Sequence, residues 1–442
     1  MRTALAALLL LCCSLVAACF PVDCGGPSGE GETTPSIQSE LPPPRAVPSA
    51  RSDSGTTWAE ELAGIDSEIV RFEALAAGRP GDWVSLQRTA GLLLKRARLT
   101  GSYDDYARAE ASLLEAFKRA PPTSGPVATR ASLNFSLHRL DRVGPDLDRL
   151  EALPALLRPK PQALSLRRGT LAFQLGQYSE ARRHIQESVD SSASHPALSS
   201  LALYFWKTGD FEAAEDLYRQ ALAAYHGRAA EPVAWTHLQL GIMDLERGRW
   251  SAAQQHYEEA GRALAGWYLV DEHLAEVLLL QGNRDEAVAI YERVIDATGS
   301  PEFMAALAGI EEERGRSAAA RSWIERADAA YAEQLTRFPE AAYGHALDHF
   351  AEFGRPERAL DLAEKNHAIR PNGEAKTSLA AAYLAAGRIG DATRLVEEAL
   401  ASPYRTAELH AVASEVLDAG KLRERAAEQR RKALAIHPLI FD

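Results

Sequence analysis

The chain has 442 residues, of which 46% are hydrophobic but only 7% aromatic, so its apolar side chains are mostly Ala and Leu. A net charge of −12, from 61 acidic and 49 basic residues, disfavours nonspecific binding to nucleic acid, whose phosphates require clustered Lys and Arg. All four cysteines lie within the first 24 residues, which excludes a disulfide or a thiolate metal site elsewhere. Since Ala and Leu are strong helix formers and alternating β-branched runs are scarce, the composition predicts an all-α protein.

Residues 1–18 have the layout of a secretory signal peptide: a positive charge at Arg2, an apolar stretch, then small residues. The apolar stretch is shorter than the roughly 20 residues that a membrane-spanning helix needs. The segment ends in Val-Ala-Ala and runs directly into Cys19, which resembles the bacterial lipobox, in which the cysteine is lipidated and becomes the new amino terminus. The resemblance implies an exported protein that is anchored in the bacterial envelope through the lipid on Cys19. The alternative is an ordinary signal peptide cleaved nearby.

The residues after this cysteine predict a flexible connection to the membrane. Phe20 stands where the sorting rule of enteric bacteria has Asp for inner-membrane retention, so the resemblance favours the outer membrane, with the protein facing the periplasm. Residues 19–56 are rich in Pro, Gly, Ser and Thr and hold too few apolar residues for a core. We expect a lipidated, disordered tether with an average reach of roughly 30–35 Å, at about 5–6 Å × √n.

A glycine followed five residues later by an alanine recurs along the rest of the chain. The pairs are Gly176/Ala181, Gly209/Ala214, Gly248/Ala253, Gly282/Ala287, Gly315/Ala320, Gly354/Ala359 and Gly387/Ala392. By subtraction, successive glycines are 33, 39, 34, 33, 39 and 33 residues apart, an interval typical of stacked helical hairpins. Glycine suits the sharp turn between two helices, and alanine lets the second helix pack closely on the first. The two longer intervals predict longer helices or loops around residues 225–233 and 331–339.

These units resemble the tetratricopeptide repeat family. Its pattern has Leu and small residues in the first helix, Gly at the turn, then Ala, an aromatic residue and a second Ala in the second helix. One matching unit contains Leu240, Gly241, Gly248, Ala253, Tyr257 and Ala260. The resemblance covers roughly residues 85–440 and implies an all-α, right-handed solenoid of stacked helix-turn-helix repeats with a concave groove lined by the first helices. We expect degenerate helical repeats over residues 57–161, well-matched repeats over residues 162–403 and a C-terminal capping repeat over residues 404–442.

Catalytic motifs are missing from the sequence. It contains no G-x-S-x-G elbow, Walker loop or dinucleotide fingerprint in its repeat region. His345 and His349 share one helical face, as a zinc pair requires, but Ala346 stands where a metalloprotease has its Glu. The sequence therefore predicts a protein that is not an enzyme and has no cofactor and no metal site. A metal-binding protein or metal-dependent enzyme centred on these two histidines is the alternative.

The family resemblance assigns a set of first-helix residues to the groove. It begins with apolar and aromatic residues and becomes acidic, a pattern that favours a partner protein with a basic or amphipathic segment. The candidate groove residues are Phe173, Trp206, Trp235, Leu238, Leu245, Glu272, Glu276, Glu312, Glu313, Asp348 and Glu352. The resulting hypothesis is a noncatalytic, membrane-anchored scaffold that supports assembly of an envelope complex and binds no nucleic acid. A self-assembling structural protein is a further alternative, and the sequence predicts no particular oligomeric state.

Overall fold

The computed structural model describes residues 56–121 and 124–442. The signal peptide at residues 1–18, the lipidation site Cys19 and all but the last residue of the tether at residues 19–56 lie outside the described residues, so these predictions stay predictions.

Twenty-one α-helices dominate the described part of the chain. They are α2 (Trp58–Gly78), α3 (Trp83–Thr100), α4 (Tyr103–Arg119), α5 (Val127–Ser136), α6 (Leu140–Glu151), α7 (Pro161–Gln174), α8 (Tyr178–Ser191), α9 (His195–Lys207), α10 (Phe211–Ala224), α11 (Glu231–Leu245), α12 (Trp250–Ala263), α13 (Tyr268–Leu280), α14 (Arg284–Thr298), α15 (Pro301–Glu313), α16 (Ser317–Arg337), α17 (Pro339–Glu352), α18 (Pro356–Ile369), α19 (Gly373–Ala385), α20 (Ile389–Ala401), α21 (Ala407–Ala419) and α22 (Arg423–Ile436). Two short strands, β1 (Thr56–Thr57) and β2 (Leu264–Ala265), pair in parallel.

Consecutive helices from α3 to α22 form antiparallel hairpins, and each hairpin packs on the next. At the turns, Gly176 and its counterparts have positive φ values, which a residue with a Cβ adopts only at a cost. Five residues further on, Ala181 and its counterparts are at most 2% exposed, so the second helix of each hairpin packs directly on the first. The described chain is therefore an all-α helical repeat solenoid, as the repeat pattern predicts. The right-handed sense of the coil stays a prediction.

The two longer repeat intervals have different structural causes. Between α10 and α11 the extra residues form a loop, whereas near residue 331 they lengthen α16, which extends to Arg337. One cluster of buried side chains extends from α2 to α21, because each hairpin buries its apolar faces against both neighbours. Within residues 56–121 and 124–442, none of the helices has both the length and the apolar character that crossing a bilayer requires.

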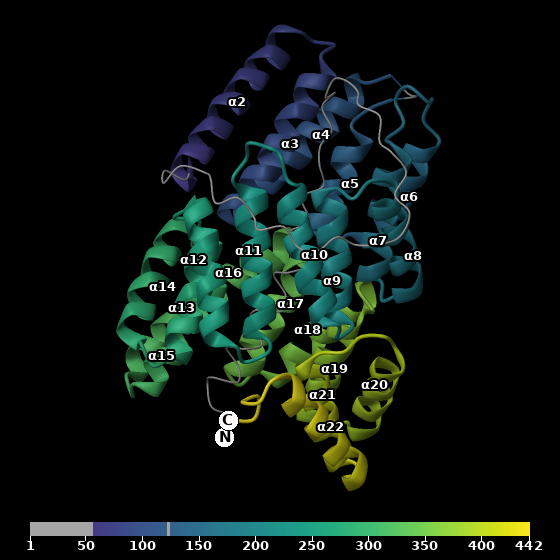
Figure 1. Cartoon of the computed structure of the whole chain (residues 1–442). Helices are drawn as coiled ribbons and strands as arrows, with labels where there is room; N and C mark the ends of the chain where they lie inside the picture. Colours follow the sequence, from purple (N-terminus) through teal and green to yellow (C-terminus); the bar gives the residue numbers. More distant parts are fainter. Residues whose placement is uncertain (1–55, 122–123) are drawn as a thin grey trace.

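The solenoid coils tightly enough for its successive turns to touch. In Figure 1 the green and yellow helices α17–α22 return beneath the blue and teal helices α7–α10. The Tyr178 hydroxyl accepts a hydrogen bond of 2.8 Å from the backbone N–H of Gly373. One unit later, the backbone N–H of Arg405 donates to the carbonyl oxygen of Lys207 over 2.9 Å. Each of these contacts joins residues almost 200 positions apart in the chain; Gly373, for example, is 195 residues beyond Tyr178.

Candidate functional site

The first helices of the later hairpins carry a row of carboxylates, which we call the acidic wall. These first helices contact their neighbours directly, as α15 contacts α17 and α19 contacts α21. The charges of Glu276 and Glu302 raise the pKa of Glu272. In the same way, the nearby carboxylates Glu352, Glu374 and Glu408 raise the pKa of Asp348. The charge of Glu312 raises the pKa of Glu352. The acidic wall therefore consists of Glu272, Glu276, Glu302, Glu312, Asp348, Glu352, Glu374 and Glu408, on helices α13, α15, α17, α19 and α21.

The middle of the wall crowds carboxyl groups together, and the part of the chain that the structure describes places no compensating cation among them. Burial raises the pKa of Asp348 well above its ordinary value, and the neighbouring carboxylates add to the shift. Burial and the nearby Glu312 raise the pKa of Glu352 from 4.5 to about 8. Among the described residues, no Lys or Arg lies within ion-pair distance of these three carboxylates, whereas carboxylates elsewhere on the molecule are commonly paired. The arrangement is suited to accepting an external cation.

A tyrosine hydroxyl lies beside the same carboxylates. Tyr331 on α16 is fully buried, and its hydroxyl has no hydrogen-bond partner among the described residues. Burial raises its pKa well above the ordinary value, and Glu302, Asp348 and Glu352 contribute to that shift. A buried hydroxyl without a partner costs about 1–3 kcal/mol. The hydroxyl and the carboxylates together offer several oxygen acceptors to one cationic group.

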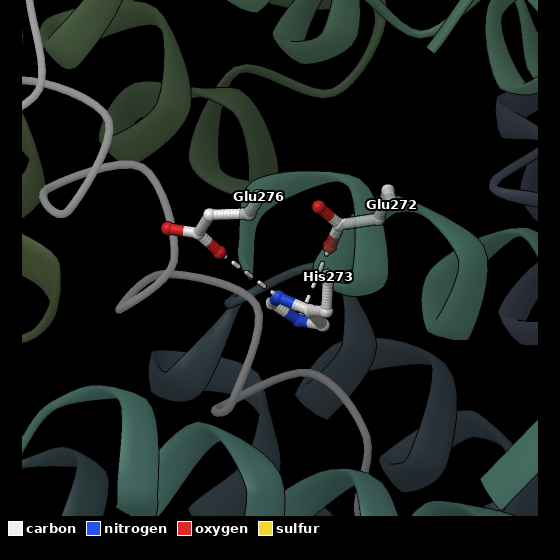
Figure 2. Close-up of side chains that lie close together, drawn as sticks. All are labelled: Glu272, His273 and Glu276. Carbon is white, nitrogen blue, oxygen red and sulfur yellow. Dashed lines mark hydrogen bonds and ion pairs between the residues drawn. The ribbon is translucent and has the colours of Figure 1, made fainter. Parts of the chain in front are cut away.

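At one end of the wall, α13 brings two carboxylates to a histidine, as Figure 2 shows. Glu272 Oε1 lies 3.1 Å from His273 Nε2, and Glu276 Oε2 lies 3.4 Å from His273 Nδ1. The imidazole stacks on the ring of Tyr257 with 5.5 Å between centroids. Burial raises the pKa of Glu272 to about 8 although His273 opposes the shift, and the two carboxylates raise the pKa of His273 against its burial.

The aromatic half of the predicted groove is not an open surface. Trp206, Trp235, Leu238 and Leu245 are at most 3% exposed and belong to the core. The Trp206 Nε1–H donates to Glu246 over 2.8 Å, which fixes the indole in its buried position. These four side chains therefore do not form an open groove surface, contrary to the expectation, and any part they have in partner binding stays a prediction.

The remaining predicted residues divide between the wall and other surfaces. Phe173 is partly buried, with its ring centroid 5.6 Å from that of Tyr178 and 6.3 Å from that of Tyr204. Glu313 forms a 3.0 Å ion pair with Arg284 on α14 and is not part of the wall. The other predicted acidic residues, namely Glu272, Glu276, Glu312, Asp348 and Glu352, belong to the wall, and their role in binding stays a prediction.

Sequence reasoning missed several members of the wall. Glu302, Glu374 and Glu408 are each the second residue of a first helix, on α15, α19 and α21. Glu340 has the same place on α17, so this position is acidic in four consecutive units. That repetition is a signal that the sequence contains, although acidic residues in a first turn also stabilise a helix through its dipole. Tyr331 carries no such signal, because its carboxylate neighbours come from other helices, and His273 carries none, because a histidine beside acidic residues of its own helix is a common pattern.

The histidine pair that the sequence singled out does not form a shared site. His349 Nε2 lies 2.8 Å from Asp328 on α16, whereas His345 Nδ1 lies 3.9 Å from Glu302 on α15. The two imidazoles therefore have different partners on different helices. The cluster of metal-ligating side chains that the described residues do form is the one on α13.

Comparison with known proteins identifies the repeats. No curated protein matches the chain in sequence. Solved structures with similar folds include the human IFIT1 dimer with m7Gppp-AAAA, with 14% identity, a TM-score of 0.40, and coverage of 80% of this chain and 90% of that one. A second is pilF of Pseudomonas aeruginosa, with 17% identity, a TM-score of 0.33, and coverage of 48% of this chain and 92% of that one. A third is the APC/C hetero-tetramer Cut9–Hcn1, with 15% identity, a TM-score of 0.33, and coverage of 86% of this chain and 92% of that one. None of these similarities indicates what this chain binds.

Family models supply the assignment. Three models described as tetratricopeptide repeat match residues 194–264, 272–334 and 373–398. These segments coincide with the hairpins from α9 to α16 and with the α19–α20 hairpin, and such repeats generally mediate protein–protein interactions. These three segments of the chain are therefore tetratricopeptide repeats, and proteins built from such repeats are generally noncatalytic scaffolds.

Proposed function

We propose that this protein is a lipid-anchored scaffold of the bacterial envelope that holds a Lys- or Arg-bearing segment of a partner protein against the acidic wall. The observation that supports the partner's chemistry is the crowding of Glu312, Asp348 and Glu352 without a cation among the described residues. A cationic side chain between these carboxylates would relieve their repulsion and gain charge-assisted hydrogen bonds.

The anchor rests on the sequence of the leader. Cys19 after Val-Ala-Ala provides the lipid attachment, and residues 20–56 provide the reach between the bilayer and the repeats. Outer-membrane attachment facing the periplasm follows from Phe20, and assembly of an envelope complex is the process that such a scaffold would serve. Cys19→Ser should release the protein from the membrane fraction, and mass spectrometry of the mature amino terminus should find acyl chains on the wild-type protein alone. A wild-type amino terminus without lipid would contradict the anchor.

The partner site is tested with a defined probe. A fluorescent peptide of alternating Lys and Ala is titrated with the full chain, and a Glu-Ala peptide serves as the control ligand. The double substitution Asp348→Asn/Glu352→Gln should weaken binding of the basic peptide about tenfold, or about 1.4 kcal/mol, and reduce its dependence on salt.

The matched control variant is Glu313→Gln. It removes a carboxylate of the neighbouring unit, on α15, that is already paired with Arg284 outside the wall, so it should leave the affinity unchanged. Equal affinities of wild type and the double variant would remove the wall from the binding site. A loss of the same size in Glu313→Gln would show that net charge alone drives the binding.

A further inference from the structure

The last helix of the solenoid, α22, has an uncovered basic face. In earlier hairpins the second helix also packs on the first helix of the next unit, as α20 packs on α21, whereas no helix follows α22 among the residues that the structure describes. Figure 1 shows α22 at the opposite end of the molecule from α2. We propose that α22 and the turn before it bind the surface of a membrane that contains anionic lipids. The inference rests on the proposed lipid anchor for the nearness of a bilayer, and it is independent of the acidic wall.

The first argument is the charge of this end of the chain. Residues 421–442 contain six basic and three acidic side chains, a net charge of +3, whereas the whole chain has −12. Two of the six are paired, Arg425 with Glu397 and Lys432 with Glu428, both at 2.6 Å. The other four have no carboxylate within ion-pair distance among the described residues. They form what we call the basic end: Lys421, Arg423, Arg430 and Arg431.

The second argument is that apolar side chains accompany these cations. Leu422 and Leu439 are 40% and 39% exposed. Arg423 and Arg430 lie two turns apart on the same side of α22, and the Arg430 guanidinium lies 3.7 Å from the centre of the Phe441 ring. Exposed apolar side chains beside unpaired cations are the combination that binds an anionic lipid surface, because the apolar groups enter the interface while the cations meet the headgroups.

The turn before α22 gives an independent observation. Lys421 has a φ of +63°, a left-handed conformation that the corresponding turns give to glycine, such as Gly387 at +72°. Lys421 stands five residues before the buried Ala426, just as Gly387 stands five residues before Ala392. A residue with a Cβ is strained in this conformation, and such strain is typical of functional positions. Here it places a further cation beside Arg423, at the edge of the basic end.

The position of the anchor allows this contact. Thr56, the residue that follows the proposed tether, pairs with Leu264 at the end of α12. Helix α12 has 14 residues, which is about 21 Å at 1.5 Å per residue. At its other end, a Cβ on Gly248 would lie 3.0 Å from His437 Cε1, directly after α22. A tether with an average reach of roughly 30–35 Å can therefore hold the lipid and the basic end at the same bilayer.

The experiment is co-sedimentation with lipid vesicles. It uses the mature chain, residues 19–442, with Cys19→Ser, so that neither the leader nor a lipid holds the protein to the vesicle. Vesicles of equimolar phosphatidylglycerol and phosphatidylcholine should bind the protein, with an affinity that falls as salt rises, and vesicles of phosphatidylcholine alone should not. Each Lys or Arg near an anionic surface strengthens binding about fivefold, so Arg423→Gln/Arg431→Gln should weaken it about 25-fold.

Two further variants make the comparison specific. Arg142→Gln/Arg321→Gln removes two exposed arginines, on α6 and α16, that also have no carboxylate within ion-pair distance among the described residues, so it changes the net charge equally and should leave binding unchanged. Lys421→Gly should weaken binding about fivefold and raise Tm, because glycine relieves the left-handed strain. A purely structural role of Lys421 would change Tm alone. Circular dichroism checks the folding of each variant.

The outcomes separate cleanly. Binding to anionic vesicles that is lost in the α22 variant but kept in Arg142→Gln/Arg321→Gln supports the basic end as a membrane contact. No binding to anionic vesicles, or equal losses in the two double variants, overturns it. Binding of the Glu-Ala peptide instead of vesicles also overturns it and assigns an acidic protein segment to this face. The lipid on Cys19 is measured separately by mass spectrometry, so a failure of the anchor and a failure of the basic end give different results.

Discussion

The contact between successive turns of the solenoid can be tested with two glycines that share a backbone conformation but differ in surroundings. Gly176 and Gly387 both occupy the turn of a hairpin, with φ values of +71° and +72°. A Cβ on Gly387 would meet nothing within 4 Å. A Cβ on Gly176 would lie 2.7 Å from the carbonyl oxygen of Pro371 and 3.1 Å from the Cα of Asn372, both in the α18–α19 loop of the next turn.

The two alanine substitutions therefore differ by one physical effect. Each places an L-residue in the left-handed region, at a cost of about 1–2 kcal/mol. Gly176→Ala in addition forces the backbone of the α18–α19 loop to move, and such overpacking typically costs about 1–3 kcal/mol. We expect Gly176→Ala to be more destabilising than Gly387→Ala by that second amount.

Urea unfolding followed by circular dichroism measures the difference. A solenoid of many units need not unfold in two states, so hydrogen exchange of the Asn372 and Gly373 amides provides the local readout. Gly176→Ala should accelerate exchange there, and Gly387→Ala should not. Equal destabilisation by the two variants, with unchanged exchange in this loop, would refute a packed contact between turns.

Two further predictions use the same logic. Tyr178→Phe should destabilise the protein by about 1–3 kcal/mol, because the buried N–H of Gly373 loses its acceptor, and its effect should be less than additive with Gly176→Ala in urea unfolding; full additivity would mean that the two residues act at separate places. Since the pKa of Glu352 is about 8 in the folded protein against 4.5 as its ordinary value, the folded state holds a proton that the unfolded state has lost over this range, and stability should fall as pH rises from about 4.5 to 8. Glu352→Gln should remove about 1–2 kcal/mol of this loss of stability between pH 4.5 and 8, after solvent screening is taken into account. An unchanged dependence of stability on pH would mean that another group titrates.

The hairpins were predictable from sequence because their determinants are local. A glycine at the turn and an alanine five residues later act within one unit, so the pair at Gly176 and Ala181 already implies a bend followed by close packing. The pattern repeats in register, and each copy strengthens the prediction for the others. The same reasoning reached the acidic half of the first helices, since Asp348 and Glu352 lie one helical turn apart on α17.

The closure of the coil was not predictable in this way. It depends on small rotations between units that accumulate over almost 200 residues, and no residue pattern within one repeat records their sum. For that reason Trp206 and Trp235 were assigned to an open groove although they are buried, and the contact of Tyr178 with the α18–α19 loop left no trace in the sequence. In the α13 cluster, Glu272 and Glu276 were predicted as groove residues but His273 was not, because a histidine next to one acidic residue and one turn from another is a common spacing in any acidic helix.

The position of each carboxylate along its helix affects the electrostatic energy of the acidic wall, which is least favourable in the middle. Glu302 and Glu374 lie in the first turn of α15 and α19, where the positive end of the helix dipole stabilises a carboxylate by about 0.3–1 kcal/mol. Glu312 and Glu352 lie in the last turn of α15 and α17, where the dipole has the opposite sign and adds to their mutual repulsion. The unfavourable energy is therefore concentrated at the C-terminal ends of two neighbouring first helices. A cation bound there is attracted by the carboxylates and by both helix ends, so substitutions at this place should affect a basic partner more than substitutions in the first turns.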